Sequence, residues 1–213
     1  MGEITLRDGL VVAAASVGAR LKQALIIERE ILPGGWKDSA VDLVVSRSKR
    51  HKKKQKQIVI GSTELKWWRQ SDASNSSNRR KDLIKDFLRA AAIYPEVESF
   101  SFVALLATTN SWNSTAITAG SDKDVMDLVN STGTEKWNVT KLKASKSLGN
   151  AVRSIKGRVP VVNVFHTQLL SEFQVTTPVG ITCFARVWSV RKPQKSVELD
   201  TSKIDSLFPS KAS

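Results

Sequence analysis

Residues 41–68 read VDLVVSRSKRHKKKQKQIVIGSTELKWW and contain two β-forming stretches on either side of a basic run. Val41–Val45 is a short apolar run, and Gln57–Trp68 is a longer segment rich in β-branched and aromatic residues. Two such runs joined by a polar connection are typical of a β-hairpin. Gly61 lies inside the second run, where a glycine often marks a β-bulge. The segment therefore predicts a hairpin with a charged tip at residues 47–57.

The tip carries seven Lys/Arg side chains within residues 47–56, and no acidic residue interrupts them. Like charges at this density cannot pack into a core, and the phosphates of nucleic acid or of an anionic membrane bind them most strongly. The run also has the composition of a nuclear import signal. The alternative is a solvated loop that only aids solubility. With a second basic cluster at 79–81, the candidate phosphate-binding residues are Arg47, Lys49, Arg50, Lys52, Lys53, Lys54, Lys56, Arg79, Arg80 and Lys81.

Periodicity predicts three further elements in the N-terminal half of the chain. Leu10–Leu32 has apolar residues at three- and four-residue steps, which indicates an amphipathic helix that packs on its own domain or lies on a membrane or partner. Lys81–Tyr94 predicts a second helix, with Asn78 as its N-cap. Phe100–Thr108 is an almost continuous apolar stretch of strand length, so we expect a central strand buried on both faces.

The C-terminal half adds shorter elements. Lys123–Val129 and Ser145–Ile155 have helical patterns, and Thr167–Phe173 reads as a short helix. Val161–Phe165 reads as a strand, and Ile181–Val190 alternates in the manner of a strand with two different faces.

These patterns together predict an α+β fold, in which a single antiparallel sheet is packed by a few helices on one side. We divide the chain into an N-terminal amphipathic helix or arm at 1–36, an α+β core domain at 37–192 and a polar C-terminal tail at 193–213.

Composition limits the possible functions. The chain has 213 residues, with 33 basic and 20 acidic side chains and a net charge of +13, so acidic partners are expected. Cys183 is the only cysteine and no internal disulfide is possible, which suits a reducing compartment. With only His51 and His166 besides, no metal-ligand cluster or cofactor site is expected from these residue types. No secretory signal is recognised in the N-terminal residues.

One catalytic arrangement is present in the predicted hairpin. Asp42 lies on one strand, and Glu64-Leu65-Lys66 lies on the other. An Asp followed by Glu-x-Lys on adjacent strands is the layout of a metal-dependent nuclease, in which two carboxylates hold Mg²⁺ and the lysine stabilises the attacking water. The alternative, which we prefer from the sequence, is that the three residues form the polar face of the hairpin.

Two longer blocks carry a family resemblance. Residues 78–110 read NRRKDLIKDFLRAAAIYPEVESFSFVALLATTN, a basic turn that leads into an alanine-bearing helix and then an apolar strand. Residues 160–190 read PVVNVFHTQLLSEFQVTTPVGITCFARVWSV, with a strand, a short helix containing a phenylalanine and a long alternating strand. In this order and spacing, both blocks resemble the matrix proteins of rhabdoviruses.

The resemblance implies a rhabdovirus-matrix-like fold and a non-enzymatic structural protein. Such proteins bind the viral ribonucleoprotein, the inner leaflet of the anionic membrane and one another, and they condense the nucleocapsid for budding. A loop that binds the neighbouring subunit in the family would here be Thr115, Ala116, Ile117, Thr118 and Ala119. The contact with lipid or nucleocapsid would fall to 49–56.

The chain has no Pro-Pro-x-Tyr budding motif, which together with the import signal fits a plant-infecting member that replicates in the nucleus. A nuclear import receptor is then a further partner, and the expected locations are the virion interior beneath the membrane and the host nucleus and cytoplasm. The alternative functions are a plant-virus movement or coat protein, or a nuclear RNA-binding protein.

Overall fold

The computed structural model describes residues 8, 12, 25–33, 36–51, 54–68, 75–93, 100–117 and 120–209. At positions 49–51, 54–56, 100 and 117 the description covers the backbone only.

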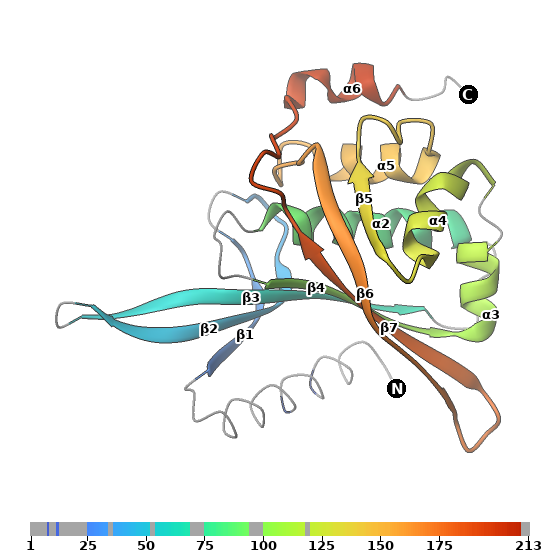
Figure 1. The fold of residues 1–213 in the computed structure, drawn as a ribbon, viewed down its shortest axis with the longest axis horizontal. Coiled ribbons are helices and arrows are strands. Elements are labelled where there is room, and N and C mark those ends of the chain that lie inside the picture. Colours follow the sequence, from blue (N-terminus) through green and yellow to red (C-terminus); the bar gives the residue numbers. More distant parts are fainter. Residues whose placement is uncertain are drawn as a thin grey trace.

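A single seven-stranded sheet forms the centre of the fold (Figure 1). Its order is β1-β2-β3-β4-β7-β6-β5. The strands are β1 (Leu25–Ile31), β2 (Val41–His51), β3 (Lys54–Trp68), β4 (Phe100–Thr108), β5 (Thr134–Asn138), β6 (Val164–Thr176) and β7 (Thr182–Arg191). The α+β class and the single sheet are thus confirmed.

The prediction of a purely antiparallel sheet is wrong for one pair of neighbouring strands. β3 and β4 run parallel, whereas the other neighbouring strands are antiparallel. The connection between β3 and β4 contains helix α2 (Ser76–Ala92), and such a helical crossover returns the chain to the edge where the previous strand began. The sheet is therefore mixed.

The predicted β2–β3 hairpin is confirmed, and its ends meet at His51 and Lys54. Val45 pairs with Gly61 while Ser46 pairs with Val59, so Ile60 is the extra residue of a β-bulge beside the glycine. In the part of the chain that the structure describes, β1 pairs with β2 as far as Arg47, and beyond that point the hairpin projects from the body of the molecule (Figure 1).

Helices lie over one face of the sheet (Figure 1). Besides α2 they are α3 (Thr109–Trp112), α4 (Lys123–Asn130), α5 (Lys146–Ile155) and α6 (Ile204–Leu207), and a π-helical turn follows α3 at Asn113–Ile117. The helices predicted near 81–94, 123–129 and 145–155 are confirmed, although α2 begins earlier and has Asn75, not Asn78, at its N-cap position. Within the described residues, no helix is long and apolar enough to cross a bilayer.

Two predicted helices are strands instead. The last residues of the predicted Leu10–Leu32 helix form β1, and most of the remainder lies outside the described residues. Thr167–Phe173 is part of β6, which pairs with β7 over its length. In both segments, hydrogen bonding to a neighbouring strand overrides a weak local helical pattern.

Aromatic side chains fill the space between the helices and the sheet. Phe87 of α2 packs edge-on against Trp188 of β7. The ring centres of Phe87 and Trp137 are 5.3 Å apart. The expected polar tail also contributes to this core, because Ile204 and Phe208 are buried.

Candidate active site

The two carboxylates of the predicted nuclease motif lie side by side. Leu43 pairs with Thr63, and continuing this antiparallel register puts Asp42 beside Glu64 on the same face of the hairpin. The backbone N–H of Leu65 donates a hydrogen bond of 2.8 Å to Asp42 Oδ2. This bond fixes the Asp42 carboxylate against β3.

Helix α2 supplies two more charged residues to the same place. Arg89 Nε lies 3.3 Å from Glu64 Oε1, and Arg89 Nη1 lies 3.7 Å from Asp86 Oδ1. Asp86 Oδ2 in turn lies 3.1 Å from Lys66 Nζ. Three carboxylates and two cations thus meet between the hairpin and α2, and we call Asp42, Glu64, Lys66, Asp86 and Arg89 the charged cluster.

The interior of the charged cluster is dry, while its edge is accessible. The Glu64 and Asp86 side chains are 1% and 2% exposed, whereas Lys66 is 22% exposed and Asp42 is half-buried. Asp42, Glu64 and Lys66 share one face of the hairpin, as predicted, but at Glu64 this polar face is buried. The reason is tertiary, because α2 packs on this face.

Burial determines the ionisation of the two inner carboxyls. Burial raises the pKa of Glu64 well above its usual range, and the nearby charge of Asp86 adds to this effect despite Arg89. Burial also raises the pKa of Asp86, against the opposing influence of Lys66 and Arg89. Both inner carboxyls are therefore protonated more readily than carboxyls in water.

Asp42 and Glu64 of the charged cluster offer the oxygen ligands that a divalent cation takes. Both carboxylate oxygens of Glu64 are buried and accept no hydrogen bond, since Arg89 Nε lies outside hydrogen-bond geometry. Buried charges in proteins are paired or coordinate metals. Within the described residues no group of three or more His, Cys, Asp or Glu is arranged to hold a metal ion. Mg²⁺ nevertheless commonly binds through one or two carboxylates, and water and substrate phosphate complete its coordination. Asp42 and Glu64 can provide the two carboxylates.

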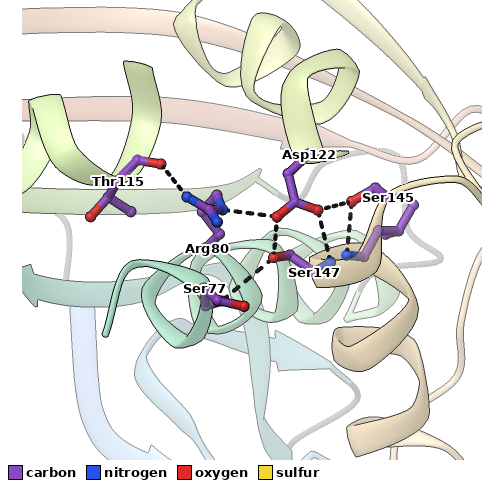
Figure 2. Close-up of polar contacts among 7 residues, drawn as sticks. Ser77, Arg80, Thr115, Asp122, Ser145 and Ser147 are labelled. Carbon is purple, nitrogen blue, oxygen red and sulfur yellow. Dashed lines mark hydrogen bonds and ion pairs between the residues drawn. The ribbon is translucent and has the colours of Figure 1, made fainter. Parts of the chain in front are cut away.

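A second buried polar cluster involves one of the predicted phosphate-binding residues (Figure 2). Asp122 accepts hydrogen bonds from the Ser147 backbone N–H (2.8 Å), Ser147 Oγ (2.6 Å), Ser145 Oγ (2.8 Å) and Arg80 Nε (2.8 Å). Arg80 also donates to the carbonyl oxygen of Thr115 at 3.0 Å. Burial opposes ionisation of Asp122, but these hydrogen bonds outweigh it and lower its pKa. The arrangement is saturated, and it ties α2 to the N-terminus of α5.

The predicted phosphate-binding residues lie in different parts of the protein. Arg80 is occupied by Asp122, and Arg47, Arg79 and Lys81 are half-buried. The backbones of Lys49, Arg50, Lys54 and Lys56 belong to the projecting part of the β2–β3 hairpin. Lys52 and Lys53 lie outside the described residues.

The predicted self-association segment is partly inside the protein. Thr115 and Ala116 belong to the π-helical turn and are buried, so their side chains do not form a free surface. Only the backbone of Ile117 is described, and Thr118 and Ala119 lie outside the described residues.

Sequence reasoning missed Asp86 and Arg89. Asp86 falls three residues after Leu83 and next to Phe87, both of which lie on the buried face of α2. A charged residue within an apolar helical stripe was a signal available in the sequence, because such residues are rarely buried without a partner.

Comparison with known proteins does not identify the chain. No protein-family model matches it, and neither does any curated protein or any solved structure. The resemblance to rhabdovirus matrix proteins therefore stays a prediction.

Proposed function

We propose that the protein is a metal-dependent nuclease whose reaction centre is the charged cluster. The observation that carries this proposal is the position of Asp42 beside Glu64, with Lys66 at the accessible edge and the Glu64 oxygens without hydrogen-bond donors. Two carboxylates and a lysine on adjacent strands are the groups that phosphodiester hydrolysis with Mg²⁺ requires. The proposal differs from the non-enzymatic function expected from the matrix resemblance.

Each residue of the cluster has a distinct task in this proposal. Asp42 and Glu64 would hold the cation, which would supply Lewis-acid polarisation of the phosphate and of the attacking water. Lys66 directs its ammonium group to the oxygen that attacks phosphorus and stabilises the negative charge that develops there. The water oxygen forms the new P–O bond and loses a proton to solvent, while the ester P–O bond breaks and the departing oxygen takes up a proton from solvent.

Asp86 and Arg89 act through the other residues of the cluster. Asp86 lies 3.1 Å from Lys66 Nζ and holds that ammonium in place, and Arg89 lies 3.3 Å from Glu64 and orients its carboxylate. We therefore assign them as positioning residues on α2. Nucleic acid is the substrate that the net charge of +13 favours, because it attracts polyanions.

The test is a cleavage assay with plasmid, linear duplex DNA, single-stranded DNA and RNA, in Mg²⁺, in Mn²⁺ and in EDTA. Wild type should cleave at least one substrate only with the divalent cation. Asp42→Asn, Glu64→Gln and Lys66→Met should each lower the rate by about 100-fold or more. Asp82→Asn is the matched control, since this carboxylate of α2 is 37% exposed and its ion-pair partners among the described residues are Lys81 and Lys85. Absence of cleavage by wild type, or cleavage by Asp42→Asn at the wild-type rate, would refute the proposal.

A second proposal retains the matrix function, and the projecting basic hairpin is the observation in its favour. In that case the protein bridges ribonucleoprotein and an anionic membrane without catalysis. Flotation with anionic liposomes should then succeed and weaken as salt is added. Flotation that fails at low salt would count against this second function.

A further inference from the structure

The projecting part of the β2–β3 hairpin is a two-stranded ribbon. Within the described residues, β1 pairs with β2 as far as Arg47, and β4 pairs with β3 from Gly61 onward. Between these limits the register pairs Ser48 with Gln57, and Lys49 with Lys56. We call residues 48–51 and 54–57 the basic arm.

The basic arm is continuous with the charged cluster, because the same two strands carry both. Asp42 and Lys49 are seven positions apart on β2, which at about 3.3 Å per residue corresponds to roughly 23 Å. The end of β2 at His51 is nine positions from Asp42, or roughly 30 Å. One turn of duplex DNA advances about 34 Å, so the arm extends over most of a helical turn from the site.

Charge and residue type on the arm point to phosphates as its ligand. The sequence from Leu43 to Thr63 contains no acidic residue, and directly paired lysines repel each other unless an anion lies close to them. From Ser46 to Gln57 there is neither an apolar residue nor a Phe, Tyr or Trp. Binding of single strands relies on aromatic stacking, and stable membrane binding relies on apolar insertion or lipidation as well as charge.

We propose that the basic arm binds double-stranded nucleic acid along a groove, about one helical turn from the phosphodiester held at the charged cluster. The inference rests on the proposed nuclease function for the position of the cleaved bond, but binding by the arm is separable from cleavage. The major groove of DNA is about 12 Å wide and admits a two-stranded β-ribbon. The arm thus selects duplexes long enough to reach it.

The test measures affinity by fluorescence anisotropy in EDTA, where cleavage does not contribute. The probes are a 30-bp duplex, a hairpin-capped 6-bp duplex and a 30-nucleotide single strand. In the arm variant, Lys49, Lys54 and Lys56 are all changed to Gln. The matched control changes three exposed lysines near α5, Lys141, Lys143 and Lys146, to Gln, so that the net charge changes equally.

Wild type and control should bind the 30-bp duplex alike, and the arm variant should bind it at least about tenfold more weakly. The slope of log K against log salt should fall by about 2.7 in the arm variant, corresponding to three lost phosphate contacts. Affinity for the 6-bp duplex should fall by a smaller factor in the arm variant, because about 20 Å of duplex cannot contact the cluster and Lys49 together.

A second variant removes the basic arm in a different way, so that the result does not depend on correct folding of the triple-glutamine variant alone. It replaces Ser48–Gln57 by an Asn-Gly turn, which keeps Arg47 paired with Ile58. Equal binding by the arm and control variants would overturn the proposal. So would an equal loss of affinity for the single strand, or arm-dependent binding to phosphatidylserine vesicles that exceeds binding to the duplex. Loss of duplex affinity in a protein without nuclease activity would refute the proposed function and leave the arm assignment standing.

Discussion

Lys66 Nζ on β3 lies 3.1 Å from Asp86 Oδ2 on α2, so the ion pair joins two successive elements of different type. Asp86 is almost completely buried, while part of Lys66 reaches the surface. The pair therefore links the interior of the charged cluster to its accessible edge. It also explains why a lysine on a hairpin strand stays close to two acidic residues and does not extend into solvent.

Divalent cations should stabilise the folded protein through Asp42 and Glu64. A ligand that binds only the native state adds about 1.4 kcal/mol at roughly ten times its Kd, which raises Tm by about 3–5 °C in a chain of this size. We expect this increase for wild type in Mg²⁺ or Mn²⁺, and its reversal by EDTA, in differential scanning fluorimetry. Asp42→Asn should show no increase. An equal increase in that variant would place the cation elsewhere.

Stability should depend on pH through Glu64. The pKa of Glu64 in the folded protein lies well above the ordinary value of 4.5. The stability that protonated Glu64 contributes is therefore fully present below pH 4.5, and it is lost as the pH rises through the pKa of the folded state. In EDTA, Glu64→Gln should therefore gain stability relative to wild type as the pH increases from 4.5 to 8. Urea denaturation at several pH values measures this difference. A difference that stays constant with pH would show that Glu64 ionises normally.

Arg89→Met should destabilise the protein by about 3 kcal/mol, because it leaves two buried carboxylates without their shared cation. Lys85→Met on the same helix is the control, since Lys85 pairs only with the exposed Asp82 and should change stability by less than about 1 kcal/mol. Both free energies of unfolding come from denaturant titration. Similar values for the two variants would contradict the assignment of Arg89 as an interior counter-ion.

Asp122→Asn should cost about 2–3 kcal/mol, because Arg80 loses its charged partner and the donors at the start of α5 lose a strong acceptor. The lowered pKa of Asp122 means that this contribution is present above about pH 3.8 and is lost as the pH falls through the folded pKa. Asp124→Asn, an exposed neighbour, should be nearly neutral. Denaturation of the two variants at pH 7 and at low pH tests both statements.

Gly149→Ala should stabilise the protein by about 0.5–1 kcal/mol, since Gly149 lies inside α5 and alanine favours the helix. The added Cβ would meet Phe208 at 3.6 Å, an ordinary van der Waals contact. Gly157→Ala should have the opposite sign, by about 1–2 kcal/mol, because Gly157 has a φ of +70°. A thermal melt of each variant distinguishes the signs.

Much of the fold was predictable because local patterns agree with tertiary contacts. Phe100–Thr108 and the helix around 81–94 carry strong apolar patterns, and both elements were predicted where they occur. The segments 25–31 and 167–173 were not, because their apolar spacing fits a helix while their hydrogen-bond partners are strands far away in the chain. The parallel β3–β4 pair was missed for a related reason. Local patterns do not show which strand becomes the neighbour of β3, or in which direction that strand runs.

The sequence by itself determined the charge of the molecule, the hairpin with its basic tip and the presence of Asp42, Glu64 and Lys66 on its two strands. Only the tertiary structure decided that Glu64 is buried and that Asp86 and Arg89 stand against it. Residue type and spacing fix how a strand alternates, whereas burial depends on which element packs over it. Here α2 covers the hairpin, removes water from its carboxylates and so turns a polar face into a charged cluster.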